Sequence, residues 1–188
     1  MRELTRDGTF AYVRFEASED IDRVQVRSGD TDPDGFEFFR GLGIVGYAAT
    51  FKAWLHHFPR PLFLAALRDR EVVSWAFLEE HAEAARDGRP VHVLRAIETL
   101  PSQRGKRLGL RLLLLALGQV AGHVVTKPIT AAARAFFFRV GFTDLDAEAR
   151  PPVDPRRFPG YAVLSHDRRT EALAGLAEYF PTPRSAAA

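Results

Sequence analysis

The spacing of apolar positions divides the middle of the chain into three strands followed by a helix. Apolar, aromatic and β-branched residues alternate or run together at 62–67, 71–79 and 91–99, which predicts strands. The charged turn 68–70 joins the first two strands as a hairpin. Apolar residues dominate 108–117, which predicts a buried helix. Further predicted elements are strands at 9–17, 22–27, 124–126, 142–145 and 161–165 and helices at 36–58, 131–140 and 170–180. The glycines at 41, 43 and 46 weaken the helix over 36–58, and a split of this helix is the alternative.

The order hairpin, strand, basic loop, helix, strand, helix, strand predicts a mixed α/β fold. A chain of 188 residues is long enough for one domain with a full core, and no linker or repeat divides it. We therefore expect a single domain over 1–180, with Thr170 as the N-cap of its last helix. The segment 181–188 is predicted to be a disordered tail.

A short basic loop with two glycines separates the strand 91–99 from the helix 108–117. Such a loop presents free backbone N–H groups and positive charge at a helix N-terminus, where a phosphate or diphosphate binds. The P-loop and dinucleotide patterns do not fit its glycine positions. The alternative is a basic helix start with ordinary capping. The candidate anion-binding residues are Arg104, Gly105, Lys106, Arg107, Leu108, Gly109 and Leu110.

A second informative segment is Thr130–Phe142. Its alanines favour a helix, and Gly141 stands where a left-handed residue ends one. Small side chains such as Ala133 leave room for a slim ligand along one helix face. The alternative is a core helix whose aromatic residues, including Phe136, only pack against the interior.

Together the two segments resemble the GCN5-related N-acetyltransferase (GNAT) superfamily. In its Gln/Arg-x-x-Gly-x-Gly/Ala loop, Arg104 matches the first position and Gly109 the last, whereas Arg107 replaces the middle glycine. The second motif, Asn-x-x-Ala-x-x-Phe-Tyr-x-x-x-Gly-Phe, is matched by Ala133, Phe136, Gly141 and Phe142. The chain departs from that motif at Thr130, which stands for Asn, and at Phe137, which stands for Tyr.

The resemblance implies a central mixed sheet flanked by helices, with an acyl-CoA-binding core over 72–165. It implies that two central parallel strands splay apart and that acetyl-CoA lies between them. Backbone N–H groups at the end of the strand, at Ile97 and Thr99, are then offered to the thioester carbonyl, and Thr130, Ala133, Phe136 and Phe137 line the cofactor site. The segments 1–70 and 166–180 commonly shape the acceptor site in this superfamily.

The activity that the resemblance implies is acyl-CoA-dependent N-acetyltransfer to an amine of a small molecule or protein. Direct attack by the amine suits a chain without cysteine. Glu98 is the first candidate for the general base and His92, on the same strand, the second. In the superfamily the tyrosine phenol is often the proposed acid, and Phe137 cannot donate a proton. A non-catalytic acyl-CoA-binding or regulatory domain is therefore the alternative function.

The composition limits the remaining possibilities. A formal net charge of only +2 argues against a nucleic-acid partner, and no residue pattern completes a metal site. The apolar run 112–117 is too short to cross a membrane, and the N-terminus lacks a signal-peptide core, so a cytoplasmic protein without a membrane partner is expected. The aromatic residues of 36–58 serve the core or an apolar acceptor pocket. We expect a monomer or homodimer.

Overall fold

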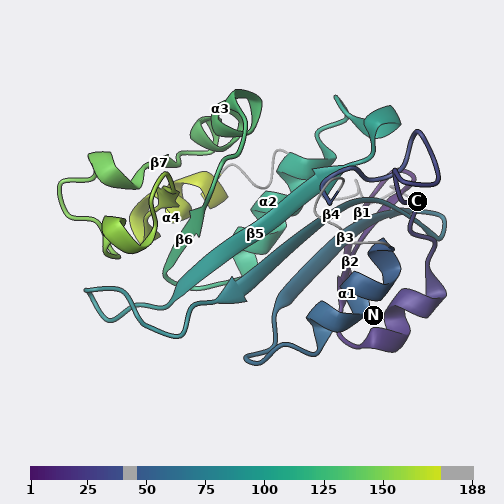
Figure 1. The fold of residues 1–188 in the computed structure, drawn as a ribbon, viewed down its shortest axis with the longest axis horizontal. Coiled ribbons are helices and arrows are strands. Elements are labelled where there is room, and N and C mark those ends of the chain that lie inside the picture. Colours follow the sequence, from purple (N-terminus) through teal and green to yellow (C-terminus); the bar gives the residue numbers. More distant parts are fainter. Residues whose placement is uncertain (40–45, 175–188) are drawn as a thin grey trace, which may run out of the picture.

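The computed structural model describes residues 1–39 and 46–174, which form an eight-stranded mixed sheet with helices on both faces (Figure 1). The strand order is β1-β2-β3-β4-β5-β6-β8-β7. This architecture confirms the predicted mixed α/β fold. The strands are β1 (Arg2–Asp7), β2 (Phe10–Phe15), β3 (Leu62–Arg68), β4 (Glu71–Glu80), β5 (Val91–Thr99), β6 (His123–Thr126), β7 (Thr143–Asp144) and β8 (Ala162–Leu164). The helices are α1 (Tyr47–Leu55), α2 (Leu108–Gln119), α3 (Ala131–Arg139) and α4 (His166–Ala174).

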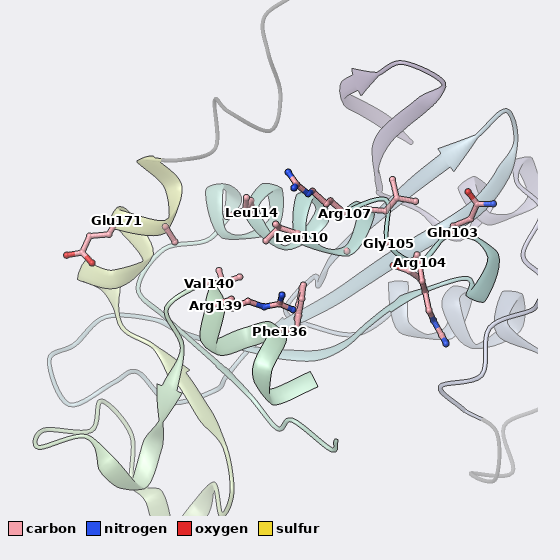
Figure 2. Close-up of a pocket in the computed structure, with 14 residues that line it drawn as sticks. Gln103, Arg104, Gly105, Arg107, Leu110, Leu114, Phe136, Arg139, Val140 and Glu171 are labelled. Carbon is pink, nitrogen blue, oxygen red and sulfur yellow. The ribbon is translucent and has the colours of Figure 1, made fainter. Parts of the chain in front are cut away.

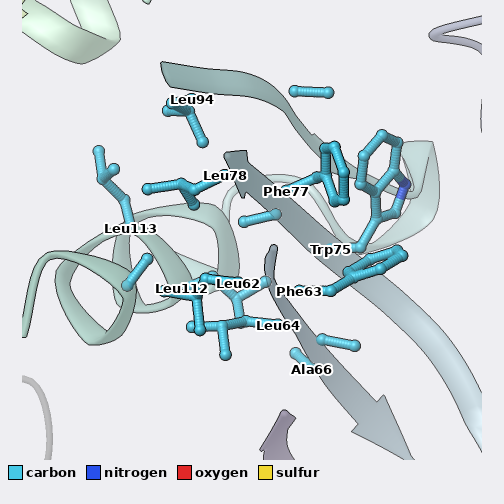
Figure 3. Close-up of a cluster of buried hydrophobic side chains, with 14 of the residues drawn as sticks. Leu62, Phe63, Leu64, Ala66, Trp75, Phe77, Leu78, Leu94, Leu112 and Leu113 are labelled. Atoms are coloured by element: carbon cyan, nitrogen blue, oxygen red, sulfur yellow. The ribbon is translucent and has the colours of Figure 1, made fainter. Parts of the chain in front are cut away.

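Buried side chains fill both faces of the central strands (Figure 3). On one face Leu62 and Leu64 of β3 lie near Leu112 of α2, and on the other face Phe63 lies beside Trp75. Helix α1 covers the aromatic face, where the rings of Trp54 and Phe77 stack with their centroids 4.2 Å apart. Strands buried on both faces read as nearly continuous apolar runs, which is why β3 and β4 were predictable.

The predicted elements include only one strand of the N-terminal hairpin: the strand predicted over 9–17 corresponds to β2, whereas β1 was not predicted. Strand β1 pairs with β2 in antiparallel register from Arg2–Arg14 to Asp7–Phe10. Gly8 and Thr9 form the two-residue turn, and Gly8 has a φ of 55°, which suits a hairpin turn. The sequence signal for this hairpin is glycine at the first turn position, Gly8. The side chains of β1 are too charged for their alternation to predict a strand.

Two predictions for 22–58 are wrong in part. The strand predicted over 22–27 is replaced by a 3-10 helix, Ser18–Arg23, followed by an isolated bridge at Gln25. Of the helix predicted over 36–58, only Tyr47–Leu55 is helical, and residues 40–45 lie outside the described part of the chain. Residues 36–39 are not helical because their backbone groups bond to other parts of the fold, as described below.

Strands β5 and β6 separate at one end, and this opening positions the site. They pair in parallel only from Val91–His123 to Leu94–Thr126, although β5 continues to Thr99 (Figure 1). Arg95 is an extra residue in the ladder with β4, so β5 bulges where the pairing with β6 stops. Pro128 follows β6 closely and has no N–H to donate, so the parallel ladder does not extend.

The ends of α3 and α4 test two capping predictions. Helix α3 ends in a Schellman motif, in which Gly141 N–H donates to Phe138 O at 3.1 Å and Phe142 N–H donates to Phe137 O at 3.2 Å. Gly141 has a φ of 104°, which confirms its predicted role. Helix α4 begins earlier than predicted, so Thr170 lies inside it and is not its N-cap. The tail predicted over 181–188 lies outside the described residues.

Candidate active site

Two adjoining cavities lie where β5 and β6 separate. The larger, of about 840 Å³, runs between the N-terminal half of α2, the last turn of α3 and α4 (Figure 2). The smaller, of about 440 Å³, lies between the end of β5, the loop after β6 and α3. Thr99, Arg104, Gly109 and Phe136 line both cavities, so the two form one groove that passes the N-terminus of α2. We call it the α2 groove.

The start of α2 has the features of an anion site. Its N-cap residue, Arg107, makes no side-chain cap hydrogen bond, so the first-turn N–H groups have no side-chain acceptor there. Arg104 and Gly105 line the groove together with Leu108, Gly109 and Leu110. Lys106 is the exception among the predicted loop residues, because its ammonium donates to Gln103 Oε1 at 2.8 Å and its side chain lines neither cavity.

Arg107 has an unusual backbone conformation. It stands where the superfamily motif has glycine, and its φ of 60° and ψ of 16° lie in the left-handed region that favours glycine. A side chain in that region costs about 1–2 kcal/mol. Arg107 therefore adopts the left-handed conformation that glycine favours at this position, and it is a strained, cationic residue beside the groove.

Replacing Arg107 tests this strain. Arg107→Gly and Arg107→Ala both remove the guanidinium, but only glycine relieves the left-handed conformation. We expect Arg107→Gly to be more stable than Arg107→Ala by about 1 kcal/mol, which is roughly 2–4 °C in Tm for a chain of this size. Thermal unfolding without ligand measures the difference. Equal melting temperatures for the two variants would contradict the left-handed assignment.

Helix α3 supplies the wall opposite α2. Thr130 caps the helix by accepting a hydrogen bond from Ala133 N–H at 3.0 Å. Phe136 faces both cavities, and Ala133 lines the smaller one. Phe137 is buried, with its ring centroid 5.3 Å from that of Phe142, so it belongs to the core as well as to the wall of the smaller cavity. This helix therefore offers an apolar lining and no acidic hydroxyl at position 137.

The free edge of β5 offers backbone donors to the groove. Leu100 N–H donates to Val73 O at 3.0 Å, so by alternation the backbone of Glu98 also faces β4. The N–H groups of Ile97 and Thr99 therefore point to the side from which β6 has diverged. The Thr99 hydroxyl is held by Ser74, with the two oxygens 2.8 Å apart. Ser74 is fully buried and is a residue that sequence reasoning missed.

Glu98 lies partly buried at the end of β5 that borders the smaller cavity. Its Oε1 accepts hydrogen bonds from the backbone N–H groups of Glu37 at 2.6 Å and Phe38 at 2.9 Å. Its Oε2 accepts a longer one, at 3.3 Å, from the Tyr47 hydroxyl. Burial raises the pKa of the Glu98 carboxyl above its usual range, against the effect of these donors and of Arg104. Glu98 thus holds residues 37–38 over the cavity and keeps one oxygen less occupied than the other.

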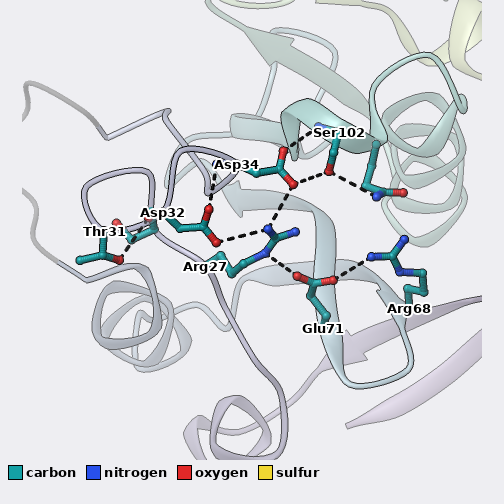
Figure 4. A network of polar contacts seen from close by, with 9 residues as sticks. Arg27, Thr31, Asp32, Asp34, Arg68, Glu71 and Ser102 are labelled. Atoms are coloured by element: carbon teal, nitrogen blue, oxygen red, sulfur yellow. Dashed lines mark hydrogen bonds and ion pairs between the residues drawn. The ribbon is translucent and has the colours of Figure 1, made fainter.

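A polar network holds the preceding loop in place (Figure 4). The Arg27 guanidinium lies 3.2 Å from Asp32 and 3.1 Å from Asp34, and it also pairs with Glu71. Asp34 in turn accepts hydrogen bonds from the Ser102 hydroxyl and from Ser102 N–H, which lower the pKa of its carboxyl. Because Ser102 precedes the basic loop, this network ties the N-terminal segment to the groove. Asp32 and Asp34 thus hold this loop against the segment that precedes α2.

His92 is not brought together with Glu98. It lies at the other end of β5, beside Glu80 and Gln119, where it lines a separate cavity of about 120 Å³. Burial lowers the pKa of its imidazole, and the charge of Glu80 opposes that effect. Six residues of extended strand separate His92 from Glu98, which is about 20 Å. At that distance the His92 imidazole does not reach the α2 groove, so His92 is not a candidate general base there.

Comparison with solved structures identifies the fold, whereas scans against family models and curated proteins find no match. A chain in the structure of AtaTR bound with AcCoA is 13% identical, with a TM-score of 0.58 over 88% of this chain and 98% of that one. A protein assigned to the GNAT family of acetyltransferases, from Desulfovibrio desulfuricans, is 18% identical, with a TM-score of 0.53 over 83% and 98%. This chain therefore has the GNAT fold, as the two motifs predicted.

One predicted exclusion is wrong. We expected no nucleic-acid partner because the net charge is near zero. A structure of the KacTA-DNA complex contains a chain of the same fold, 11% identical, with a TM-score of 0.55 over 88% of this chain and 98% of that one. Net charge averages over the whole surface and says nothing of local patches or of an assembly, so it does not support the exclusion.

In the described part of the chain, no helix is long and apolar enough to cross a membrane.

Proposed function

We propose that this protein is an acetyl-CoA-dependent N-acetyltransferase that acts by direct attack of an amine on the thioester. The observation that carries the proposal is the opening between β5 and β6, where the free N–H groups of Ile97 and Thr99 meet the groove at the α2 N-terminus. The α2 N-terminus can bind a diphosphate, and the backbone N–H groups at the end of β5 can bind a carbonyl oxygen. Together they match a ligand that carries a diphosphate in one part and a thioester carbonyl in another.

The residues of the α2 groove fit acetyl-CoA in size and charge. The first turn of α2, with Arg104 and Arg107, holds the diphosphate, because the helix N-terminus and the guanidinium groups favour anions. Ala133 and Phe136 line the path of the pantetheine arm. The N–H groups of Ile97 and Thr99 stabilise negative charge that develops on the thioester oxygen. Acetyl-CoA supplies the activated acetyl group.

Glu98 is the proposed general base. The new C–N bond forms as the C–S bond breaks, the amine proton passes to Glu98 Oε2, and the thiolate takes a proton from water. Oε1 is held by two backbone N–H groups, so Oε2 is the oxygen that is available to the amine. Water can protonate the departing sulfur without an acidic side chain. A thiol has a reference pKa of about 8.5, so its thiolate is a good leaving group near neutral pH.

One observation favours a non-catalytic alternative. Phe137 is buried at the position where the superfamily motif has tyrosine, so the wall of the smaller cavity offers no phenol to the departing sulfur. A regulatory domain that binds acyl-CoA without transferring the acyl group would have the same groove and would not require a phenol at position 137.

Thermal unfolding with ligands is the first test. A ligand at a hundredfold excess over its Kd adds about 2.7 kcal/mol to the free energy of unfolding, roughly 5–10 °C in Tm for a chain of this size. We expect acetyl-CoA and CoA to raise Tm by this amount and ATP to raise it less, since ATP lacks the pantetheine arm.

An acceptor screen then separates the two functions. Free CoA released from acetyl-CoA in the presence of amines, measured as thiol, supports transfer. A Tm rise without thiol release from any small-molecule or peptide amine supports the binding domain. Equal melting temperatures with and without acetyl-CoA would overturn both.

A further inference from the structure

We propose that Arg139 forms a second anion site in the α2 groove and that this site recognises the phosphate on the 3′ position of the CoA ribose. The inference rests on the proposed acetyl-CoA site and adds a specificity to it. Arg139 belongs to the last turn of α3 and lines the larger cavity with Phe136 and Val140.

The position of Arg139 separates it from the first anion site. The groove runs along α2 from Leu108 to Leu114, six residues or about 9 Å of helix. Arg104 and Gly105 lie at its beginning, whereas Arg139 lies across from this stretch of α2 on α3. Figure 2 shows its side chain pointing along the groove toward Phe136. A diphosphate at the start of α2 therefore leaves Arg139 unused, and a second anion further along the ligand can reach it.

Arg139 is also the arginine of α3 that is available for a ligand. Its Nε donates to Ala135 O at 3.3 Å, and within residues 1–39 and 46–174 it makes no ion pair. The other arginine of α3, Arg134, is paired with Asp144 and lines neither cavity. An exposed cation without a carboxylate partner keeps its donors for an anion.

The charges around the larger cavity favour an anionic ligand. Its lining includes three arginines, Arg104, Arg107 and Arg139, and one carboxylate, Glu171. In Figure 2 the Glu171 carboxylate points away from the arginines. Arg104 faces Glu37 at 3.6 Å, so among the described residues Arg107 and Arg139 contribute most of the unpaired positive charge of this lining. A phosphate monoester carries nearly two negative charges at neutral pH and suits such a site.

The test compares two ligands that differ only in this phosphate. Isothermal titration of the full chain with acetyl-CoA and with 3′-dephospho-acetyl-CoA measures both affinities without any need for turnover. We expect the wild type to bind acetyl-CoA at least about tenfold more tightly, the effect of a charge-assisted hydrogen bond. Arg139→Gln is expected to bring the ratio of the two affinities toward one, because it weakens the binding of acetyl-CoA and not that of the dephospho ligand. The control Arg134→Gln should keep the wild-type ratio.

Each other outcome has a definite meaning. Equal affinities of the wild type for the two ligands would overturn the second site and leave the proposed function standing. An unchanged ratio in Arg139→Gln would show that another group reads the phosphate, and the assignment of Arg139 would be wrong. Failure of the wild type to bind either ligand would overturn both the inference and the proposed function.

Discussion

Replacing Gly109 with valine is expected to abolish acetyl-CoA binding while the protein stays folded. A Cβ atom at this position would lie 3.4 Å from Thr99 Oγ1 and 4.0 Å from Ile97 Cδ1, which are ordinary contacts. The fold therefore accepts a Cβ atom at this position, and valine is a better helix former than glycine. The added methyl groups, however, fill the space between α2 and the free edge of β5, where the two cavities join. The Tm rise with acetyl-CoA should disappear.

The matched control is Gly118→Val on the same helix. Gly118 is exposed, and a Cβ there would meet only Leu173 Cδ2, at 3.8 Å. This variant should keep the wild-type response to acetyl-CoA, so a loss confined to Gly109→Val reports on the groove and not on helix stability. If Gly109→Val bound acetyl-CoA with wild-type affinity, the ligand would not pass between α2 and β5.

Replacing Glu98 with glutamine is expected to lower kcat by about 10²- to 10⁴-fold, the contribution of a general base. Glutamine is close in shape, and its carbonyl oxygen can still accept the hydrogen bonds from Glu37 and Phe38 N–H. The variant thus removes proton transfer while it keeps residues 37–38 in place. Acetyl-CoA affinity should change little, because the proposed contacts with the ligand come from α2, α3 and the backbone of β5 and not from the Glu98 side chain.

The pH profile makes this prediction specific. Burial raises the pKa of Glu98, so wild-type kcat/KM should fall as the pH drops through that raised value. In Glu98→Gln this dependence disappears, and the rate follows deprotonation of the amine itself. Identical pH profiles for the two proteins would exclude Glu98 as the base and leave it a positioning residue.

Stability gives the control for Glu98. A carboxyl whose pKa is raised in the folded state holds its proton more tightly when folded, so its contribution to stability is lost as the pH rises from the unfolded pKa through the folded one. At neutral pH the buried charge is therefore unfavourable, and Glu98→Gln should melt no lower than wild type. Glu98→Ala loses the hydrogen bonds to Glu37 and Phe38 as well and should melt lower.

Local patterns in the sequence were sufficient for the centre of the fold. The bounds of β5 and the start of α2 agree with the predicted 91–99 and 108–117 because the apolar and β-branched pattern of the strand and the glycine-containing loop are signals that span only a few residues. The Schellman end of α3 follows from one glycine and one phenylalanine. Where local signals were weak or conflicted, prediction failed, as for residues 36–39, which were predicted to be helical, and for the charged strand β1.

The sequence alone determined the central strands and helices, their order and a basic, glycine-containing loop before a helix, since these depend on side-chain period, capping and charge within short windows. It did not determine that Glu98 bonds to backbone groups sixty residues earlier, that His92 lies at the far end of its strand, or that Arg139 faces the groove while Arg134 pairs with Asp144. Those contacts depend on how the sheet twists, bulges and opens, because the packing of segments that are distant in the sequence determines which polar groups lie within bonding distance.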